Sequence, residues 1–306
     1  MPIINRFGRR SRLLLAMMLA SAPLLAAELT ETAIESSTQR PEISPTKLET
    51  PPVIDGDLSD PVWQQVANID NFRQTQPVLN DEPSERTKAW FAYDADNIYV
   101  AIRAYDSDPS AVIASEMRRD GDLEANDQVM IYFDTFADRR NAFMFATNAS
   151  GALVDGKIEN NETFNIQWNG IWDSKSRLDA EGWTVEMVIP VKTLSFDPNN
   201  DQWGLEIVRR VRRKAERMRW ANISQNRQDV YVASYGDMNG ITGLRQGMGL
   251  EFVPSFAMLT TKNRPVGDSD QMGVAGGDIT YRITPSLTAT ATINTDFSDA
   301  PVDQVQ

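Results

Sequence analysis

The chain has 306 residues, 43 of them acidic and 30 basic, and it contains no histidine and no cysteine. This composition excludes disulfides, thiolate metal sites and catalysis by cysteine or histidine, so a bound metal would need oxygen ligands, as calcium and magnesium accept. The net charge of −13 argues against nucleic acid as a partner, because a protein that binds it has to neutralise phosphates.

Residues 1–27 have the features of a secretory signal peptide. Four arginines between Arg6 and Arg12 precede an apolar run, Leu13 to Ala27, which is too short to cross a bilayer as a helix. Leu25 stands where a small residue is preferred before cleavage, and a start-stop membrane anchor is the alternative. We expect an exported protein, located on the periplasmic side or at the surface of a bacterial outer membrane.

Residues 28–42 are predicted to form a polar, proline-containing linker, and the segment that runs on to Pro52 favours at most an edge strand. A turn follows at Asp55-Gly56-Asp57. Ser59 or Asp60 is expected to cap a short helical turn that has Pro61 at its first position, with Trp63 pointing inward.

From residue 87 onward, short apolar segments alternate with turn signals at the spacing of a β-sandwich. Thr87 to Tyr93 and Asn97 to Tyr105 form a predicted hairpin, and Gln128 to Asp134 reads as a strand that is buried on both faces. Long helical periodicity is absent. We therefore predict an all-β fold, an immunoglobulin-like or jelly-roll-type β-sandwich over residues 43–246.

Four blocks in order carry a resemblance to family 9 carbohydrate-binding modules: VIDGDLSDPVW, YDADNIYVAIRAYDSDP, NDQVMIYFDT and GWTVEMVIP. The match runs from about Ile43 to Leu244. A closer resemblance is to bacterial outer-membrane proteins in which such a module precedes a β-barrel. The recognisable pieces there are FDTFADRRNAFMFATNASGALVDG, IQWNGIWDSK and VRRVRRKAERMRW. The resemblance implies a module that binds oligo- or polysaccharide without cleaving it and serves polysaccharide capture or carbohydrate catabolism at the outer membrane.

The resemblance also implies a site in which two tryptophans sandwich a terminal sugar. Their places fall at or near Leu123 and near Asp229 to Tyr231, and neither is tryptophan in this sequence. A saccharide site would have to be built from other residues. We predict Trp168, Trp172, Asn165, Asn169, Tyr231 and Tyr235 as ligand-binding candidates. For the two tryptophans, a loop lid packed on the sheet is the alternative.

Carboxylates flank several predicted strand ends, and oxygen-rich clusters of this kind suit calcium. The candidate ligands for a structural Ca²⁺ are Asp106, Asp120, Asp122 and Asp127, and related modules, by the resemblance, do carry such an ion. The alternative is that these are solvated turn residues, because the spacing of an EF-hand loop is missing.

No catalytic motif is present. Glu186 and Glu206 are candidates for a glycoside hydrolase that acts through two carboxylates, but acidic residues are so common here that no motif selects one pair. Binding without catalysis is therefore preferred over hydrolysis. A ligand-free plug or assembly domain is a further alternative. The basic run from Arg209 to Arg219 is expected to pair mainly with acidic neighbours, and an anionic glycan or lipopolysaccharide phosphate is the other possible partner.

Residues 247–306 change character, because apolar and polar residues alternate with period two. In the last segment Leu287, Ala289, Ala291 and Ile293 share one face, as in an outer-membrane strand. We predict the beginning of a β-barrel domain that continues in a longer protein. The alternative is that these strands extend the sandwich.

Overall fold

The computed structural model describes residues 40–224, 229–246, 249–263, 268–284 and 287–294, and the predicted signal peptide lies outside them. Within these ranges the chain forms strands, loops and short 3-10 turns, without an α-helix. In the same ranges, no helical segment has the length and apolar character needed to cross a bilayer.

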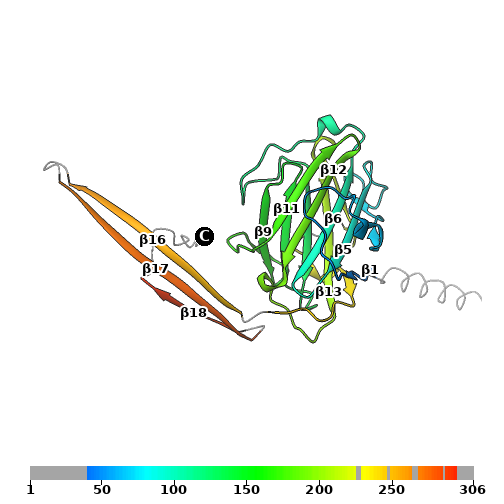
Figure 1. The fold of residues 1–306 in the computed structure, drawn as a ribbon. Helices are drawn as coiled ribbons and strands as arrows, with labels where there is room; N and C mark the ends of the chain where they lie inside the picture. The colour runs from blue at the N-terminus through cyan, green and yellow to red at the C-terminus, as the bar shows by residue number, and fades with distance from the viewer. Residues whose placement is uncertain (1–39, 225–228, 247–248, 264–267, 285–286, 295–306) are drawn as a thin grey trace, which may run out of the picture. The chain divides into compact units, whose positions relative to one another are not determined.

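Two sheets form the predicted sandwich (Figure 1). Sheet A has nine strands, and its main path runs β1 (Glu42–Ile43), β15 (Gly236–Asn239), β13 (Gln202–Val211), β7 (Gln128–Asp134), β8 (Ala142–Asn148), β9 (Leu153–Glu159) and β10 (Thr163–Asn165). Two more strands, β14 (Glu216–Arg219) and β4 (Arg73–Gln76), extend it beside β13. Sheet B runs β11 (Asp173–Asp179), β12 (Gly182–Pro190), β6 (Asn97–Tyr105), β5 (Thr87–Tyr93) and β2 (Thr46–Lys47), with β3 (Asn68–Ile69) also paired to β5.

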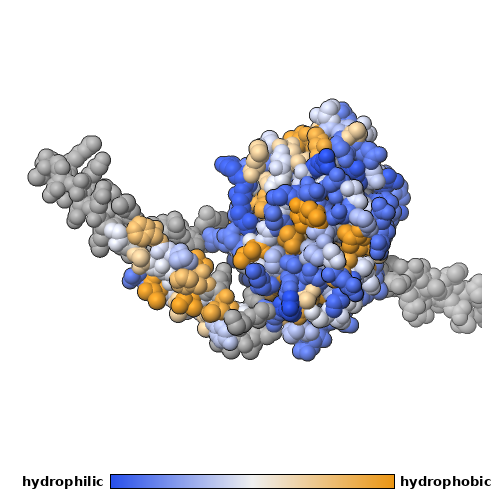
Figure 2. All heavy atoms as spheres, in the orientation of Figure 1, coloured by the Kyte–Doolittle hydropathy of each residue, from blue (hydrophilic) through white to orange (hydrophobic). Residues whose placement is uncertain are grey.

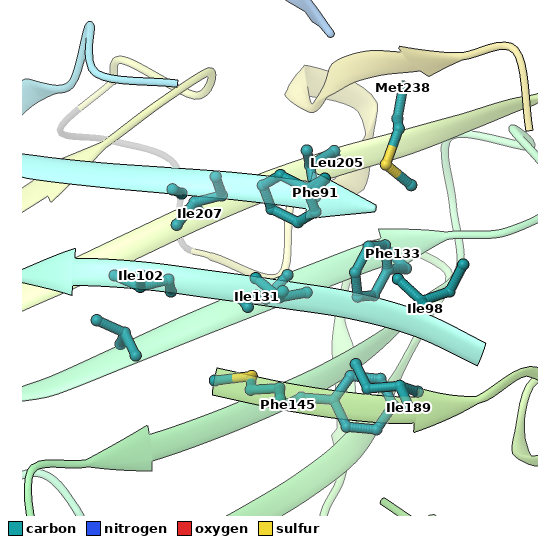
Figure 3. Close-up of a cluster of buried hydrophobic side chains, with 14 of the residues drawn as sticks. Phe91, Ile98, Ile102, Ile131, Phe133, Phe145, Ile189, Leu205, Ile207 and Met238 are labelled. Carbon is teal, nitrogen blue, oxygen red and sulfur yellow. The ribbon is translucent and has the colours of Figure 1, made fainter. Parts of the chain in front are cut away.

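The core lies between the two sheets, because every second residue of each central strand points inward. Figure 3 shows part of it, with Ile131 and Phe133 from β7 and Phe145 from β8 packed near Phe91 and Ile102 of sheet B. Phe133 meets Phe91 edge to face with ring centroids 6.4 Å apart, a favourable arrangement for aromatic rings.

The outer face of sheet A is also apolar, which explains why β7 and β8 are buried at every position. Met130, Tyr132, Met144, Ala146 and Val154 form a second cluster there. Loops rather than a third sheet cover part of this surface. Because β7 and β8 carry apolar residues on both faces, one face of these strands fills the core and the other forms an apolar surface on the outside of the sandwich.

The N-terminal turn closes the outer face of sheet B. Trp63, in the 3-10 turn Pro61–Gln64, is buried as predicted. Asp60 occupies the N-cap position, but its side chain makes no cap hydrogen bond. It accepts one from the backbone N–H of Val53 at 2.9 Å instead. Asp60 therefore stands at the predicted position, but its side chain does not cap the turn. The backbone turn at Asp55 and Gly56 is held by the carboxylate of Glu186.

The C-terminal strands β16 (Leu250–Asn263), β17 (Asp268–Thr284) and β18 (Leu287–Ile293) form an antiparallel sheet of their own, sheet C. They extend neither sheet of the sandwich, so the alternative placement is not observed. The strands predicted for this C-terminal segment are present.

The basic run from Arg209 to Arg219 pairs internally, as expected. Arg210 pairs with Glu124, and Arg217 and Arg219 both pair with Asp229. Arg213 bridges Asp106 and Glu85 at 2.7 and 2.8 Å. Arg209 is buried and donates to the carbonyl oxygens of Arg86 and Tyr105.

Glu85 should make folding stability depend on pH at the acid end. Burial alone raises the pKa of this carboxyl, but hydrogen bonds from Lys214 and Ser107 outweigh burial and hold it at about 2, against an ordinary 4.5. The contribution is full above the unfolded pKa and is lost as pH falls from about 4.5 toward 2, a difference of about 3 kcal/mol. Denaturant unfolding of the wild type and Glu85→Gln at several pH values should show two curves that converge in acid. Parallel curves would contradict this assignment.

Candidate functional site

A groove of about 490 Å³ lies over the outer face of sheet A, within the size range of ligand sites. Its floor is the apolar cluster of β7, β8 and β9. One wall is the segment 121–124, another is made by Phe164 and Ile166, and a third by Asp229 and Val230. Arg210 and Arg217 also line it.

The strand register divides the groove into a charged side and an apolar side. Arg210 on β13 stands opposite Gln128 of β7 and opposite Arg217 of β14. In the other direction the floor continues through apolar residues. Met130 faces Ala146, which faces Val154. Charged groups therefore gather over β13 and β14, and apolar groups over β8, β9 and β10.

Phe164 reaches the floor because Gly156 leaves room for its ring. A Cβ added at Gly156 would lie 2.6 Å from the tip of the Phe164 ring and 2.9 Å from the carbonyl oxygen of Asn165. Any larger residue would force this wall to move. Phe164 remains 39% exposed and Ile166 47%, so both present apolar surface at the rim.

On the charged side, three arginines pair with two carboxylates. Arg217 and Arg219 share the carboxylate of Asp229, and Arg210 pairs with Glu124. Burial, together with the neighbouring charges of Arg219 and Arg210, lowers the pKa of Arg217 to about 10. The guanidinium is still protonated at neutral pH. This wall therefore offers N–H donors beside carboxylate acceptors, the combination that hydroxyl groups use.

Burial raises the pKa of Tyr132 to about 12, so the phenol on the floor stays neutral. Its hydroxyl lies 3.5 Å from the sulfur of Met130. The amide Nε2 of Gln128 donates to the carbonyl oxygen of Leu123 at 2.9 Å. The floor thus keeps these polar groups engaged within the protein.

The two positions that correspond, by the resemblance, to the family's sugar-binding tryptophans lie in the same groove. Leu123 lies in one wall, and Asp229 and Val230 lie in another wall of the same groove. The flat aromatic pair is replaced by a leucine on one side and by a charged and a branched side chain on the other.

The two predicted tryptophans lie elsewhere. Trp172 is only 7% exposed, packs on Phe145 and donates from Nε1 to Asp155 at 3.0 Å. This corrects the prediction of a ligand platform, because its ring belongs to the core. Trp168 is half-buried and packs on Phe143 with ring centroids 4.9 Å apart. It seals the edge of the inter-sheet core, which supports the alternative of a lid packed on the sheet.

The other ligand-binding candidates do not line the groove either. Tyr235 is fully buried and donates to the carbonyl oxygen of Asp229 at 2.5 Å, so its predicted contact with a ligand is wrong. Tyr231 lies at the N-cap of the 3-10 turn Val232–Ser234. Asn165 accepts from the backbone N–H of Gln167, and Asn169 donates to the Gln167 carbonyl at 3.4 Å. Both asparagines organise their own loop.

Glu186 and Glu206 cannot work as a catalytic pair. Glu186 follows the inward-facing Val185 on β12 of sheet B, and Glu206 follows Leu205 on β13 of sheet A. Their side chains therefore leave the sandwich on opposite outer faces. Sheets pack about 10 Å apart, whereas hydrolysis needs carboxyl groups about 5 Å or 6.5–9.5 Å apart across a cleft.

Both glutamates accept hydrogen bonds from backbone N–H groups, and Glu186 also accepts one from an indole N–H. Glu186 accepts from Trp63 Nε1 at 2.7 Å and from two N–H groups of the turn at Asp55. Burial raises the pKa of Glu186, and these hydrogen bonds oppose the rise. The two glutamates therefore have structural roles.

The proposed calcium ligands are separate from one another. Asp106 pairs with Arg213, and Asp127 accepts from the backbone N–H groups of Ile113 and Arg212. Asp122 accepts from the N–H of Glu124, and Asp120 lies 3.6 Å from Arg119. Across the described ranges, no three acidic side chains gather closely enough to hold a metal ion. This corrects the calcium prediction, because each carboxylate is already used locally.

Sequence reasoning missed Phe164, Ile166 and the apolar floor. The spacing of Phe164 and Ile166 beside a turn was the only signal in the sequence for the rim of the groove, and it was weak. Nothing in the sequence shows that Gly156 makes space for it.

Comparison with known proteins identifies the family and proteins of similar fold. A family model described as carbohydrate family 9 binding domain-like matches residues 54–239. A candidate carbohydrate-binding protein from Bacteroides uniformis has a similar fold, with a TM-score of 0.52 and 16% identity over 66% of this chain and 99% of that one.

Two structures of a family 9 carbohydrate-binding module from Caldicellulosiruptor kristjanssonii are also similar, both at 18% identity. The complex with cellotriose has a TM-score of 0.48 and covers 68% of this chain and 96% of that one. The complex with glucose has a TM-score of 0.47, with 66% and 96% covered. No curated protein matches the chain.

Two packed sheets with a groove on the outer face of one define a β-sandwich with a candidate ligand site. The family match extends over more than half of the sequence. The chain belongs to the carbohydrate family 9 binding domain-like family.

Proposed function

We propose that the chain binds a saccharide in the groove on the outer face of sheet A. One observation carries this proposal. The two positions that the family resemblance assigns to sugar contacts, near Leu123 and near Asp229, line the same groove. The family assignment supports the class of ligand, and the groove supports the location.

The chemistry of the groove suits a sugar ring. A pyranose has apolar ring faces and a rim of hydroxyl groups that both donate and accept. The apolar floor at Met130, on the strand next to β13, can take the ring face. The pairs Arg210–Glu124 and Arg217–Asp229 offer donors and acceptors at its edge.

Replacing Arg210 with methionine should weaken saccharide binding about tenfold, because one charge-assisted hydrogen bond at the edge of the ring is lost. Stability should change little, since the partner Glu124 is largely exposed and exposed ion pairs contribute at most about 1 kcal/mol. The measurement is calorimetric titration of the full chain with the glycans that it retains on an array.

The control is Arg177→Met, because Arg177 on β11 of sheet B also pairs with a partly exposed carboxylate, that of Asp57, and does not line the groove. This variant should bind like the wild type. Retention of no glycan by folded wild-type protein would refute the saccharide function. Equal affinity of the wild type and Arg210→Met would place the site outside the groove.

We propose further that the chain is exported and that its C-terminal sheet begins a β-barrel domain in the outer membrane. There the sandwich would serve polysaccharide capture. The support is the distribution of side chains on sheet C. By register, Phe252 stands beside Ile279 and Ala291, and Leu250 beside Tyr281 and Ala289.

The two faces of sheet C differ in polarity. The apolar face is exposed, with Phe252 at 64% and Phe256 at 73%, and Figure 2 shows orange residues along the described part of this sheet. On the other face Thr292 donates to Asp278 at 2.6 Å, and Thr280 lies 3.3 Å from Thr290. An apolar face on one side and hydrogen-bonded threonines on the other is the pattern of a strand between lipid and a polar interior.

The full chain should associate with phosphatidylcholine vesicles. Phe252→Asp together with Phe256→Asp should reduce the bound fraction strongly, because a charge on a lipid-facing strand costs up to a few kcal/mol. Flotation of vesicles measures it. Thr280→Asp with Thr290→Asp, on the opposite face, is the control and should float like the wild type. Equal flotation of wild type and phenylalanine variant would exclude the lipid-facing role.

A further inference from the structure

We propose that the groove accepts a saccharide carrying a linear alkyl or acyl chain, with the sugar at the arginine–carboxylate side and the chain across β8, β9 and β10. The inference rests on the saccharide function proposed above and specifies its ligand. It follows from the uneven distribution of polarity across the groove.

The apolar side is longer than a sugar ring needs. Neighbouring strands lie about 4.8 Å apart, so Met130 on β7 and Val154 on β9 are separated by about 10 Å. Phe164 on β10 continues the same surface. This length suits a chain of several methylene groups that crosses the strands.

The shape of the floor also favours a chain over a second sugar ring. A flat sugar face is held best by a flat aromatic ring, and the floor offers flexible Met130 and Met144 and a branched Val154 instead. Methionine adapts its shape to irregular apolar ligands. The lining residues on β8, β9 and β10 include no carboxylate or guanidinium. The charged lining residues lie on β13 and β14, at Asp229 and in the segment 121–124, which follows Asp120 at the edge of β9.

The rim supplies the remaining apolar contact. Phe164 and Ile166 are held over β9 with apolar surface facing water. A bound chain would remove this surface from water, and each buried methylene improves affinity by about fourfold at most. The charged pairs at the opposite side would orient the sugar, so the two ends of the ligand are distinguished by the protein.

The test is calorimetric titration of the full chain with methyl, butyl, hexyl and octyl glycosides, each as β-glucoside and β-galactoside and below the concentration at which micelles form. Affinity should rise two- to fourfold per methylene until the apolar side is filled. Because the apolar face of sheet C could also take up alkyl chains, the series is repeated with Phe252→Ser and Phe256→Ser together. The chain-length dependence should persist in that variant.

Two substitutions locate the chain. Met144→Gln keeps the length of the side chain on the floor, and Phe164→Gln changes a rim residue that is already partly exposed, so the second variant folds even if the first does not. Both should flatten the dependence on chain length, so that the ratio of octyl to methyl glycoside affinity falls below that of the wild type. Leu178→Gln, on the exposed part of β11 in sheet B, is the matched control and should keep the wild-type slope.

The outcomes separate the two proposals. Binding of methyl glycosides with no gain from longer chains would leave the saccharide function standing and overturn this inference. A gain that is equally large for octyl tetraethylene glycol, with no effect of the sugar, would overturn the saccharide function. A gain that Phe252→Ser and Phe256→Ser abolish would assign the chain to sheet C and overturn the inference.

Discussion

Replacing Glu206 with alanine is expected to lower the free energy of unfolding by about 4 kcal/mol, because the substitution removes the acceptor for several buried donors. The carboxylate accepts from the backbone N–H groups of Ile207, Trp220, Ala221 and Asn222 at distances from 2.6 to 3.2 Å. Burial raises the pKa of Glu206, and these hydrogen bonds and Arg219 oppose the rise. Urea unfolding followed by tryptophan fluorescence measures the loss.

Glutamine at position 206 should have an intermediate effect. Its oxygen can replace Oε1, which accepts three of the four bonds, but its NH₂ group would then face the N–H of Asn222. Glu162→Ala, at an exposed position, is the control and should stay within about 0.5 kcal/mol of the wild type. An unchanged unfolding midpoint for Glu206→Ala would show that the carboxylate does not organise this segment.

Replacing Gly182 with alanine should cost about 3 kcal/mol or more. Gly182 has a φ of +135°, and an added Cβ would lie 2.2 Å from the carbonyl oxygen of Ala104 and 2.8 Å from the backbone N of Asp106. The new methyl group therefore meets backbone of the neighbouring strand β6, which cannot move aside without breaking the β12–β6 ladder. Backbone strain and steric overlap both contribute.

Gly151 provides the comparison that separates these two causes. Its φ is +78°, but a Cβ at this position meets no atom within 4 Å. Gly151→Ala should cost only about 1 kcal/mol, the cost of the left-handed backbone itself. Similar losses for the two variants would mean that the close approach to β6 does not matter. Thermal unfolding of both proteins at one pH is sufficient to decide.

The fold was largely readable from local patterns. Alternation of apolar and polar residues identifies strands such as Thr87–Tyr93, and turn residues such as Asp94-Ala95-Asp96 mark where they reverse. A strand that is apolar at every position, as β7 is, predicts burial on both faces. These signals are local because side-chain direction alternates along any strand.

The binding groove was not readable in the same way. Trp172 was expected at a ligand and lies in the core, and Phe164 was not expected and lines the groove. The choice between the two faces of a sheet changes with a shift of one residue in register. An asparagine-rich loop gives no apolar alternation that would fix this register. The prediction of a calcium site at Asp106, Asp120, Asp122 and Asp127 was wrong for a related reason. Carboxylates that are near one another in sequence need not be near one another in the folded chain.

The sequence by itself determined the all-β class, the positions of the strands along the chain, the internal pairing of the basic run from Arg209 to Arg219 and the family. It also determined the amphipathic strands of the C-terminal segment, because each of these depends on residues close together in the chain. Only the tertiary structure decided that Leu123, Phe164, Arg210 and Asp229 surround one groove, and that Glu186 and Glu206 point to opposite sides. Those relations depend on strand order and register across sheet A, which bring together residues about a hundred positions apart.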